Sequence, residues 1–159
     1  WYLTSPSSRT MVATAIRPRR TIAVHLPPAD APQVGQTLRD AGVTLLADLR
    51  QNPISRKKGF SQNALAQGCA SVGIRYEHLP ELGIASEKRK NLATQADVDA
   101  LFAEYERDWL PTQGAALAKL GAWVAAGERV ALTCFERAPG DCHRHCVAEA
   151  LGCLDVKHL

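Results

Sequence analysis

The sequence predicts an α/β fold, in which an open, mostly parallel sheet of about four to five strands carries helices on both faces in a three-layer, Rossmann-like arrangement. Two observations favour this class. Short apolar segments rich in β-branched residues alternate along the chain with segments of helical periodicity. Every connection between strands is also long enough for a crossover, which parallel neighbours require, and the right-handed crossover rule puts helices on both faces.

The composition is that of an ordinary globular protein. Hydrophobic residues make up 46% and charged residues 22% of the 159 residues, which is enough chain for one domain with a real core. The net charge of +3 permits an anionic ligand but does not require one. No apolar run approaches the roughly 20 residues of a membrane span, and the first residues do not resemble a signal peptide. Five cysteines without a regular framework favour reduced thiols, so we expect a cytoplasmic protein without membrane contact.

Residues 1–20 are predicted to form a flexible N-terminal arm, and residues 21–159 a single domain. The arm is polar, contains Pro6 and Pro18, and ends in a basic stretch. Because the only methionine is Met11, we interpret the residues before it as added or wrongly assigned sequence ahead of the native start.

Five segments have the composition of strands, and turn residues separate them from their surroundings. The first is rich in β-branched residues and is followed by Pro27 and Pro28, whereas Pro80 stops the third. The predicted strands are residues 21–25, 43–50, 74–80, 129–134 and, at the end of the chain, 156–159.

Helical periodicity characterises the segments between these strands. In residues 33–42, Val34, Leu38 and Ala41 share one face, and Gly42 suits a helix end. The other predicted helices are residues 61–73, 96–110, 113–127 and 142–152, and residues 81–95 are predicted to be a long loop.

Ionisable or thiol side chains follow the predicted strands at their carboxyl ends. Asp48 and Arg50 end the second strand. His78 ends the third strand and Cys134 the fourth. Ligands of open parallel sheets bind beyond this edge, so we expect one pocket formed by the exits of strands two, three and four. The alternative is that polarity simply rises where a strand leaves the core.

The stretch CFERAPGDCHRHC, residues 134–146, places three cysteines beside two histidines. With Asp141 as N-cap, residues 142–144 would form a first helical turn whose N–H groups and dipole can bind an anion and make a thiol more acidic. We expect His143 to point inward, because it shares a face with apolar residues of the helix. Arg144 would stay free to reach a carboxylate or phosphate.

No metal site and no cofactor are predicted. Zinc sites pair cysteines two to four residues apart, whereas Cys134 and Cys142 are separated by a full loop. His143 and His145 would project to different sides of a helix. Cys142 and Cys146 would share a face but supply only two ligands. A phosphatase-type loop is excluded, because a glycine stands where that loop would return its arginine.

A basic loop follows the second strand. Arg56, Lys57 and Lys58 precede Phe60, a combination suited to phosphate pairing and base stacking, and residues 88–90 would extend the positive surface. A solvated charged loop is an equally good interpretation of this motif alone.

Several short motifs occur in a fixed order. They are an Asp-x-Arg at a strand end, an Asn-Pro pair with a downstream Phe, a Tyr-x-His-x-Pro-x-Leu-Gly segment, and a Cys-x-Glu followed by Cys-His-Arg. Their residues are Asp48 and Arg50; Asn52, Pro53 and Phe60; Tyr76, His78, Pro80, Leu82 and Gly83; and Cys134, Glu136, Cys142, His143 and Arg144. Taken jointly, these motifs resemble the family catalogued as domain of unknown function 488.

The resemblance runs from about Thr21 to the C-terminus. It implies an α/β fold with a polar cluster at the carboxyl edge of the sheet, and it makes Cys134 and Cys142 the first candidates for chemistry, but it implies no reaction. One position departs from the family pattern. Ala23 stands where glycine is usual, and that glycine would let a ligand approach the first strand.

The favoured interpretation is a small enzyme acting on a phosphate-bearing or nucleic-acid-related substrate, although the sequence leaves open whether the protein is an enzyme. Cys134 would be the nucleophile or redox thiol, with His143 or His78 as general base. Asp48 would orient a histidine or a guanidinium. The predicted catalytic residues are Cys134, His143, Asp48, His78 and Cys142, and the predicted substrate-binding residues are Arg50, Arg144, Asn52, Phe60, Tyr76 and Glu136.

Two alternatives remain beside the enzyme. The first is a non-catalytic nucleic-acid-binding module that uses the basic loop and Phe60. The second is a purely structural polar cluster, in which Asp48 pairs with Arg50 or Arg144 and ties strand ends together without any substrate. The sequence does not predict an oligomeric state.

Overall fold

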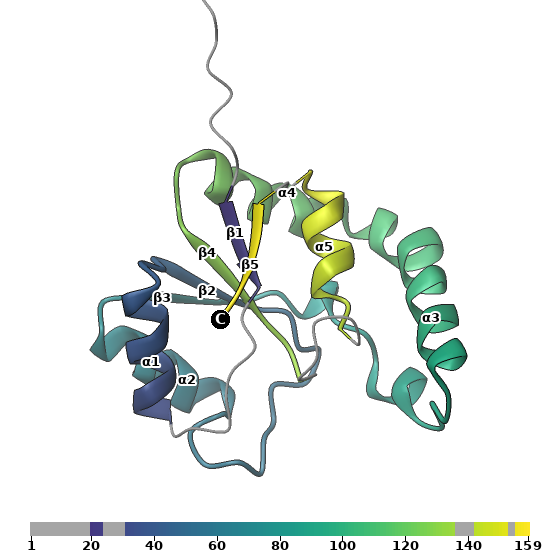
Figure 1. Cartoon of the computed structure of the whole chain (residues 1–159), viewed down its shortest axis with the longest axis horizontal. Helices are drawn as coiled ribbons and strands as arrows, with labels where there is room; N and C mark the ends of the chain where they lie inside the picture. Colours follow the sequence, from purple (N-terminus) through teal and green to yellow (C-terminus); the bar gives the residue numbers. More distant parts are fainter. Residues whose placement is uncertain (1–19, 24–30, 136–141, 153–154) are drawn as a thin grey trace, which may run out of the picture.

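The computed structural model describes residues 20–23, 31–135, 142–152 and 155–159. Its strands form one open sheet, β3-β2-β4-β1-β5, in which every pair of neighbours is parallel (Figure 1). The strands are β1 (Arg20–Ala23), β2 (Leu45–Asp48), β3 (Arg75–His78), β4 (Val130–Thr133) and β5 (Asp155–His158). The predicted α/β class and the open parallel sheet are confirmed, whereas the Rossmann-like layering stays a prediction. The predicted arm, up to residue 19, lies outside the described residues.

Apolar side chains pack on both faces of the sheet. The helices are α1 (Ala31–Asp40), α2 (Gln62–Ser71), α3 (Gln95–Glu104), α4 (Gly114–Ala125) and α5 (Arg144–Ala150). Leu46 of β2 packs in a buried cluster with Leu38 of α1 and Leu65 of α2. Its neighbour Leu45 packs in another cluster with Leu120 of α4 and residues of α3 and α5. Successive residues of β2 therefore belong to different apolar clusters, as the pleat requires.

The segment between β3 and α4 differs from the prediction. Two short 3-10 turns, Pro80–Leu82 and Ser86–Arg89, overlap residues 81–95, which were predicted to be a loop. Helix α3 ends at Glu104 and continues as a π turn, Tyr105–Trp109, and then a 3-10 turn, Leu110–Gln113. Pro111 explains part of this change, because a proline has no N–H to donate to the preceding helical turn.

Helix α3 begins with a capping box. The Thr94 hydroxyl accepts a hydrogen bond from the backbone N–H of Asp97 at 3.2 Å, and the Asp97 carboxylate accepts from the backbone N–H of Thr94 at 2.8 Å. These two bonds satisfy N–H groups that a helix start otherwise leaves unpaired. They also lower the pKa of Asp97, chiefly through the hydrogen bonds from Thr94.

Helix α5 begins later than predicted. It starts at Arg144 with His143 as the N-cap residue, so residues 142 and 143 precede the helix instead of forming its first turn. The predicted N-cap, Asp141, lies outside the described residues. Within the described chain, no helix is long and apolar enough to cross a membrane.

Candidate functional site

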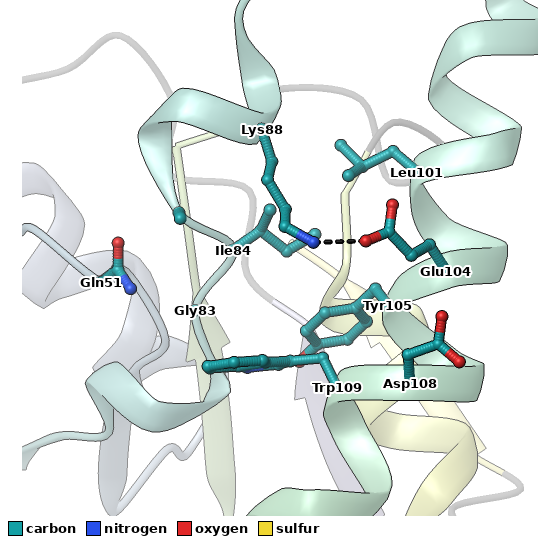
Figure 2. A pocket seen from close by; sticks show the side chains of 10 residues that line it. Gln51, Gly83, Ile84, Lys88, Leu101, Glu104, Tyr105, Asp108 and Trp109 are labelled. Atoms are coloured by element: carbon teal, nitrogen blue, oxygen red, sulfur yellow. Dashed lines mark hydrogen bonds and ion pairs between the residues drawn. The ribbon is translucent and has the colours of Figure 1, made fainter.

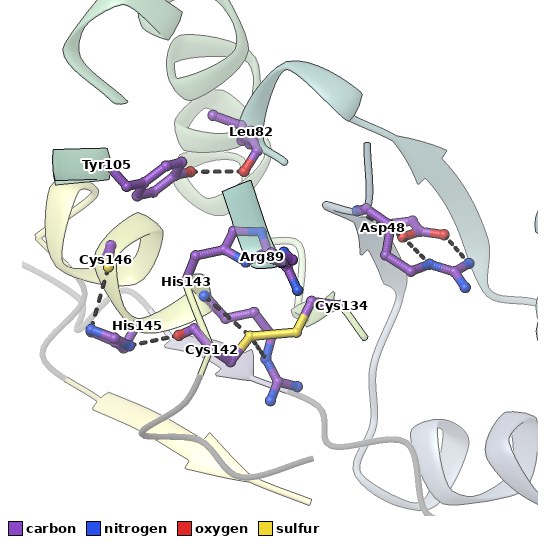
Figure 3. The surroundings of a disulfide bond; sticks show 11 residues. Asp48, Leu82, Arg89, Tyr105, Cys134, Cys142, His143, His145 and Cys146 are labelled. Carbon is purple, nitrogen blue, oxygen red and sulfur yellow. Dashed lines mark hydrogen bonds and ion pairs between the residues drawn. A yellow bond between two sulfur atoms is a disulfide. The ribbon is translucent and has the colours of Figure 1, made fainter. Parts of the chain in front are cut away.

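The predicted site residues lie at the carboxyl ends of β2, β3 and β4, but they form two clusters instead of one. Asp48 pairs in register with His78 of β3 and Thr133 of β4, so the three strand ends are neighbours. Side chains at paired positions of adjacent strands share a face of the sheet, and the next residue along points to the other face. Cys134 follows Thr133 and therefore lies on the face opposite Asp48. The expectation of one shared pocket was wrong for this reason, and Figure 3 shows Asp48 apart from Cys134.

The first cluster surrounds the carboxylate of Asp48, which is completely buried. This carboxylate accepts hydrogen bonds from Nε of Arg50 at 2.8 Å, from Nη2 of Arg50 at 2.5 Å and from the hydroxyl of Tyr76 at 2.6 Å. Arg50 also donates through Nη1 to the backbone oxygen of Phe60 at 2.8 Å. His78 holds the same segment, because its Nε2 lies 2.8 Å from the backbone oxygen of Arg50.

This bonding decides what the first cluster can do. The guanidinium of Arg50 is 3% exposed and is bonded to protein oxygens, so it does not present a fork to an incoming anion. Burial, with the neighbouring Asp48, raises the pKa of Tyr76, which therefore remains a neutral hydrogen-bond donor. The arrangement matches the structural alternative, in which Asp48 and Arg50 pair with each other.

Two predicted binding residues, Phe60 and Asn52, differ in their exposure to solvent. The ring of Phe60 is 7% exposed, and Nζ of Lys57 lies 4.1 Å from the ring centroid, so Phe60 is a core residue rather than an open stacking platform. Asn52 is exposed. Glu136 lies outside the described residues.

The second cluster contains the motif cysteines. Cys134 and Cys142 are joined by a disulfide, which corrects the expectation of reduced thiols for this pair (Figure 3). Cys142 is completely buried, whereas Cys134 is partly exposed. Arg144 is 2% exposed and donates through Nε to the sulfur of Cys142 at 3.0 Å. Arg144 therefore hydrogen-bonds a cysteine sulfur, whereas the sequence analysis expects it to be free to reach a carboxylate or phosphate.

His143 lies beside this pair and points inward, as predicted. It is completely buried, and its Nδ1 lies 3.0 Å from Nη2 of Arg89. Because arginine only donates, Nδ1 must accept, and the neutral ring carries its proton on Nε2. Burial and the charge of Arg89 lower the pKa of His143 to about 3. The nitrogen that would act as a base is thus already bonded to Arg89.

The structure contains a cavity of about 100 Å³, and Figure 2 shows the residues that line it. Gln51, Gly83, Tyr105 and Trp109 line it, and an ion pair between Lys88 and Glu104 crosses it. None of the predicted catalytic residues lines this cavity. The ring of Tyr105 connects the cavity to the second cluster, since its centroid lies 5.6 Å from that of the His143 ring.

Gly83, the last residue of the Tyr-x-His-x-Pro-x-Leu-Gly motif, is required by close backbone packing. A Cβ atom at this position would lie 2.5 Å from the backbone nitrogen of Gln51 and 2.7 Å from the backbone oxygen of Leu49. The chain leaving β3 therefore crosses directly against the chain leaving β2, which only a residue without a side chain allows.

Sequence reasoning missed Phe135 and Tyr105 as site residues, and it assigned Arg89 only to a positive surface. Phe135 is 47% exposed, directly follows Cys134, and has its ring centroid 5.3 Å from Cζ of Arg50. Arg89 and Tyr105 contact His143 from segments far away in the chain. An aromatic residue next to a motif cysteine is a sequence signal for Phe135, but nothing local indicates that Arg89 or Tyr105 contacts His143.

The cysteine cluster also has the composition of a metal site. Ligand atoms of Cys134, Cys142 and His143 lie within 4.8 Å of one another. The disulfide occupies both sulfurs, so this set could act only after reduction.

Comparison with known proteins identifies one family. The family model described as "Domain of unknown function DUF488" matches residues 30–151, so it covers the site but starts after β1, later than the resemblance suggested. No curated protein and no solved structure matches the chain.

Proposed function

The chain belongs to the DUF488 family, and we propose that it is a thiol–disulfide redox enzyme whose reactive pair is Cys134 and Cys142. The observation that carries this proposal is the contact between Arg144 and the sulfur of Cys142 at 3.0 Å, beside the bond to Cys134. A guanidinium that donates to a sulfur stabilises the thiolate and makes that sulfur the better leaving group.

The two sulfurs would have different roles. Cys134 is partly exposed, whereas Cys142 is buried behind it and bonded to Arg144. A substrate thiolate would attack the sulfur of Cys134, forming a mixed disulfide, and the electron pair of the broken bond would leave on Cys142. Both accessibility and charge favour this direction of attack.

A second substrate thiol completes the reaction. After losing its proton it attacks the substrate sulfur of the mixed disulfide and releases Cys134. The substrate dithiol has then become a disulfide, and the pair has gained two electrons and two protons. A second molecule that carries a disulfide would reoxidise the pair by the same exchange in reverse.

A substrate that bears phosphate or belongs to nucleic-acid metabolism remains part of the proposal. Arg56, Lys57 and Lys58 are exposed in the loop after β2, and Phe135 offers an exposed aromatic ring next to Cys134. These residues would favour an anionic substrate with a planar group. Because Phe60 is buried, the alternative of a simple nucleic-acid-binding module has weaker support.

Trapping of the mixed disulfide tests the assignment of roles. The Cys142→Ser chain is incubated with glutathione disulfide, and peptide masses are measured. We expect glutathione on Cys134, and we expect the matched Cys134→Ser chain to be modified at Cys142 at least about tenfold more slowly, because Cys142 is buried. Equal modification of the two variants, or none of Cys134, would reject the proposal.

A further inference from the structure

We propose that Glu106, His145 and Cys146 form a binding site for a divalent transition metal of the zinc class. The three side chains come from two elements, the π turn Tyr105–Trp109 and helix α5. Their ligand atoms, one each of oxygen, nitrogen and sulfur, lie within 4.8 Å of one another. This site shares no ligand with the Cys134–Cys142 pair and does not depend on the proposed redox function.

His145 is already oriented as a ligand. Its Nδ1 lies 2.6 Å from the backbone oxygen of Cys142, and a carbonyl can only accept, so Nδ1 carries the proton. The lone pair is therefore on Nε2, on the side of Cys146 (Figure 3). Histidines that ligate a metal through one ring nitrogen usually donate a hydrogen bond to a carbonyl or carboxylate through the other. The ring is also held by an edge contact with Phe102, at a centroid distance of 5.3 Å.

The distance between sulfur and nitrogen fits one shared ion. Sγ of Cys146 and Nε2 of His145 lie 3.3 Å apart. Zinc bonds of about 2.3 Å to sulfur and about 2.0 Å to nitrogen, at a tetrahedral angle, place these two atoms about 3.5 Å apart. The pair therefore needs only a small adjustment to hold an ion between them.

Glu106 would supply the third ligand, and its exposed position would let a metal ion reach the site from solvent. Its side chain is exposed, whereas Cys146 is 1% exposed, so the ion would lie at the surface with the sulfur on its inner side. The π turn aims Glu106 at α5, and such turns occur frequently at functional sites. With thiolate and carboxylate ligands, the site would carry two negative charges to balance a divalent ion.

Three protein ligands leave one tetrahedral position open on the exposed side. Structural zinc sites are usually closed by four ligands, and catalytic sites keep a position for water or substrate. Because cysteine binds a metal as the thiolate, metal binding to Cys146 would release the thiol proton.

Cobalt binding to the full chain tests the site. The protein is kept oxidised, so that the sulfurs of Cys134 and Cys142 cannot bind, stripped of metal with a chelator, and titrated with Co²⁺. We expect one equivalent to bind, with a thiolate-to-cobalt charge-transfer band that Zn²⁺ abolishes by displacement. The band should be absent from Cys146→Ser and present in the matched control Cys69→Ser, whose buried thiol lies in another cluster.

Glu106→Gln keeps the experiment decisive if Cys146→Ser fails to fold, because residue 106 is exposed and its replacement disturbs no packing. This variant should bind Co²⁺ at least about tenfold more weakly, since loss of a group that only hydrogen-bonds a metal ligand already weakens binding that much. The proposal is overturned if the oxidised chain shows no band, if the band persists in Cys146→Ser, or if Glu106→Gln binds as tightly as the unaltered protein.

Discussion

Replacing Asp48 by asparagine tests whether the first cluster holds the strand ends together. The carboxylate is completely buried and accepts from two nitrogens of the Arg50 side chain, from the backbone N–H of Arg50 and from the hydroxyl of Tyr76. Asparagine keeps the shape but removes the charge, so the guanidinium of Arg50, 3% exposed, loses its only close counter-ion among the described residues. Breaking a buried ion pair on one side costs about 3–5 kcal/mol.

Urea unfolding at neutral pH measures this loss as a lower free energy of unfolding. Tyr76→Phe is the matched control, because it removes one of the hydrogen bonds but neither charge, and we expect it to cost about 1–2 kcal/mol. If Asp48→Asn lowers the free energy of unfolding no more than Tyr76→Phe does, the ion pair of Asp48 and Arg50 does not stabilise the fold as its burial implies. The structural role assigned to this pair is then refuted.

Three further predictions concern backbone packing, helix capping and the disulfide. Gly83→Ala should lower the free energy of unfolding by about 1–3 kcal/mol, because its Cβ would meet backbone atoms at 2.5 and 2.7 Å. The control Gly121→Ala in α4 meets only a side-chain carbon at 3.5 Å and should raise the free energy of unfolding by up to about 1 kcal/mol. Thermal unfolding measures both, and equal effects would contradict the packing argument. The lowered pKa of Asp97 means that its cap contributes above the unfolded-state pKa and is lost as pH falls through the folded one, so Asp97→Asn should destabilise at neutral pH and change little in acid; a pH-independent effect would exclude the charge. Reduction of the disulfide should lower the free energy of unfolding by about 2–3 kcal/mol, because the bond between Cys134 and Cys142 closes a loop of sequence separation 8. Urea midpoints measured with and without a dithiol test this. An unchanged midpoint would contradict the idea that the disulfide constrains the unfolded chain.

The sequence predicted the elements of the fold better than the arrangement of the site. Alternating apolar segments and helical periodicity placed β2, β4 and α4 within a few residues of their observed bounds. Hydrophobic periodicity indicates which residues are buried, and in an α/β protein the pattern of buried residues largely determines where the strands and helices lie. It also predicted that His143 faces inward, because the neighbouring apolar positions of its segment must pack on the core.

The division of the site into two clusters could not be predicted, because it depends on register. Asp48 is the last residue of β2 and Cys134 directly follows β4, but Thr133 is the residue that pairs with Asp48. A difference of one position sends the next side chain to the opposite face, and no local pattern fixes the alignment of two strands far apart in sequence. The same limit applies to contacts such as that of Arg89 with His143, since only the folded chain brings them together.

The capacity of Glu106, His145 and Cys146 to surround an ion was missed for a similar reason. The sequence paired Cys146 with Cys142 on one helix face and did not join it to His145, and the third ligand, Glu106, comes from a π turn where a regular helix was predicted. Local irregularities of this kind arise from tertiary packing, which overrides helix propensity.

A redox titration of the Cys134–Cys142 pair tests the proposed function most directly. The folded chain is equilibrated with glutathione buffers of graded ratio, and the reduced fraction is measured by alkylation and mass, for the unaltered protein and for Arg144→Gln. Because Arg144 donates to the sulfur of Cys142 at 3.0 Å, and a charge-assisted hydrogen bond contributes about 1.5–3 kcal/mol to the thiolate, the variant should titrate about 30–60 mV more negative. A pair that cannot be reduced without unfolding the chain, or a midpoint that Arg144→Gln leaves unchanged, would contradict the assignment of Cys142 as the stabilised leaving thiolate.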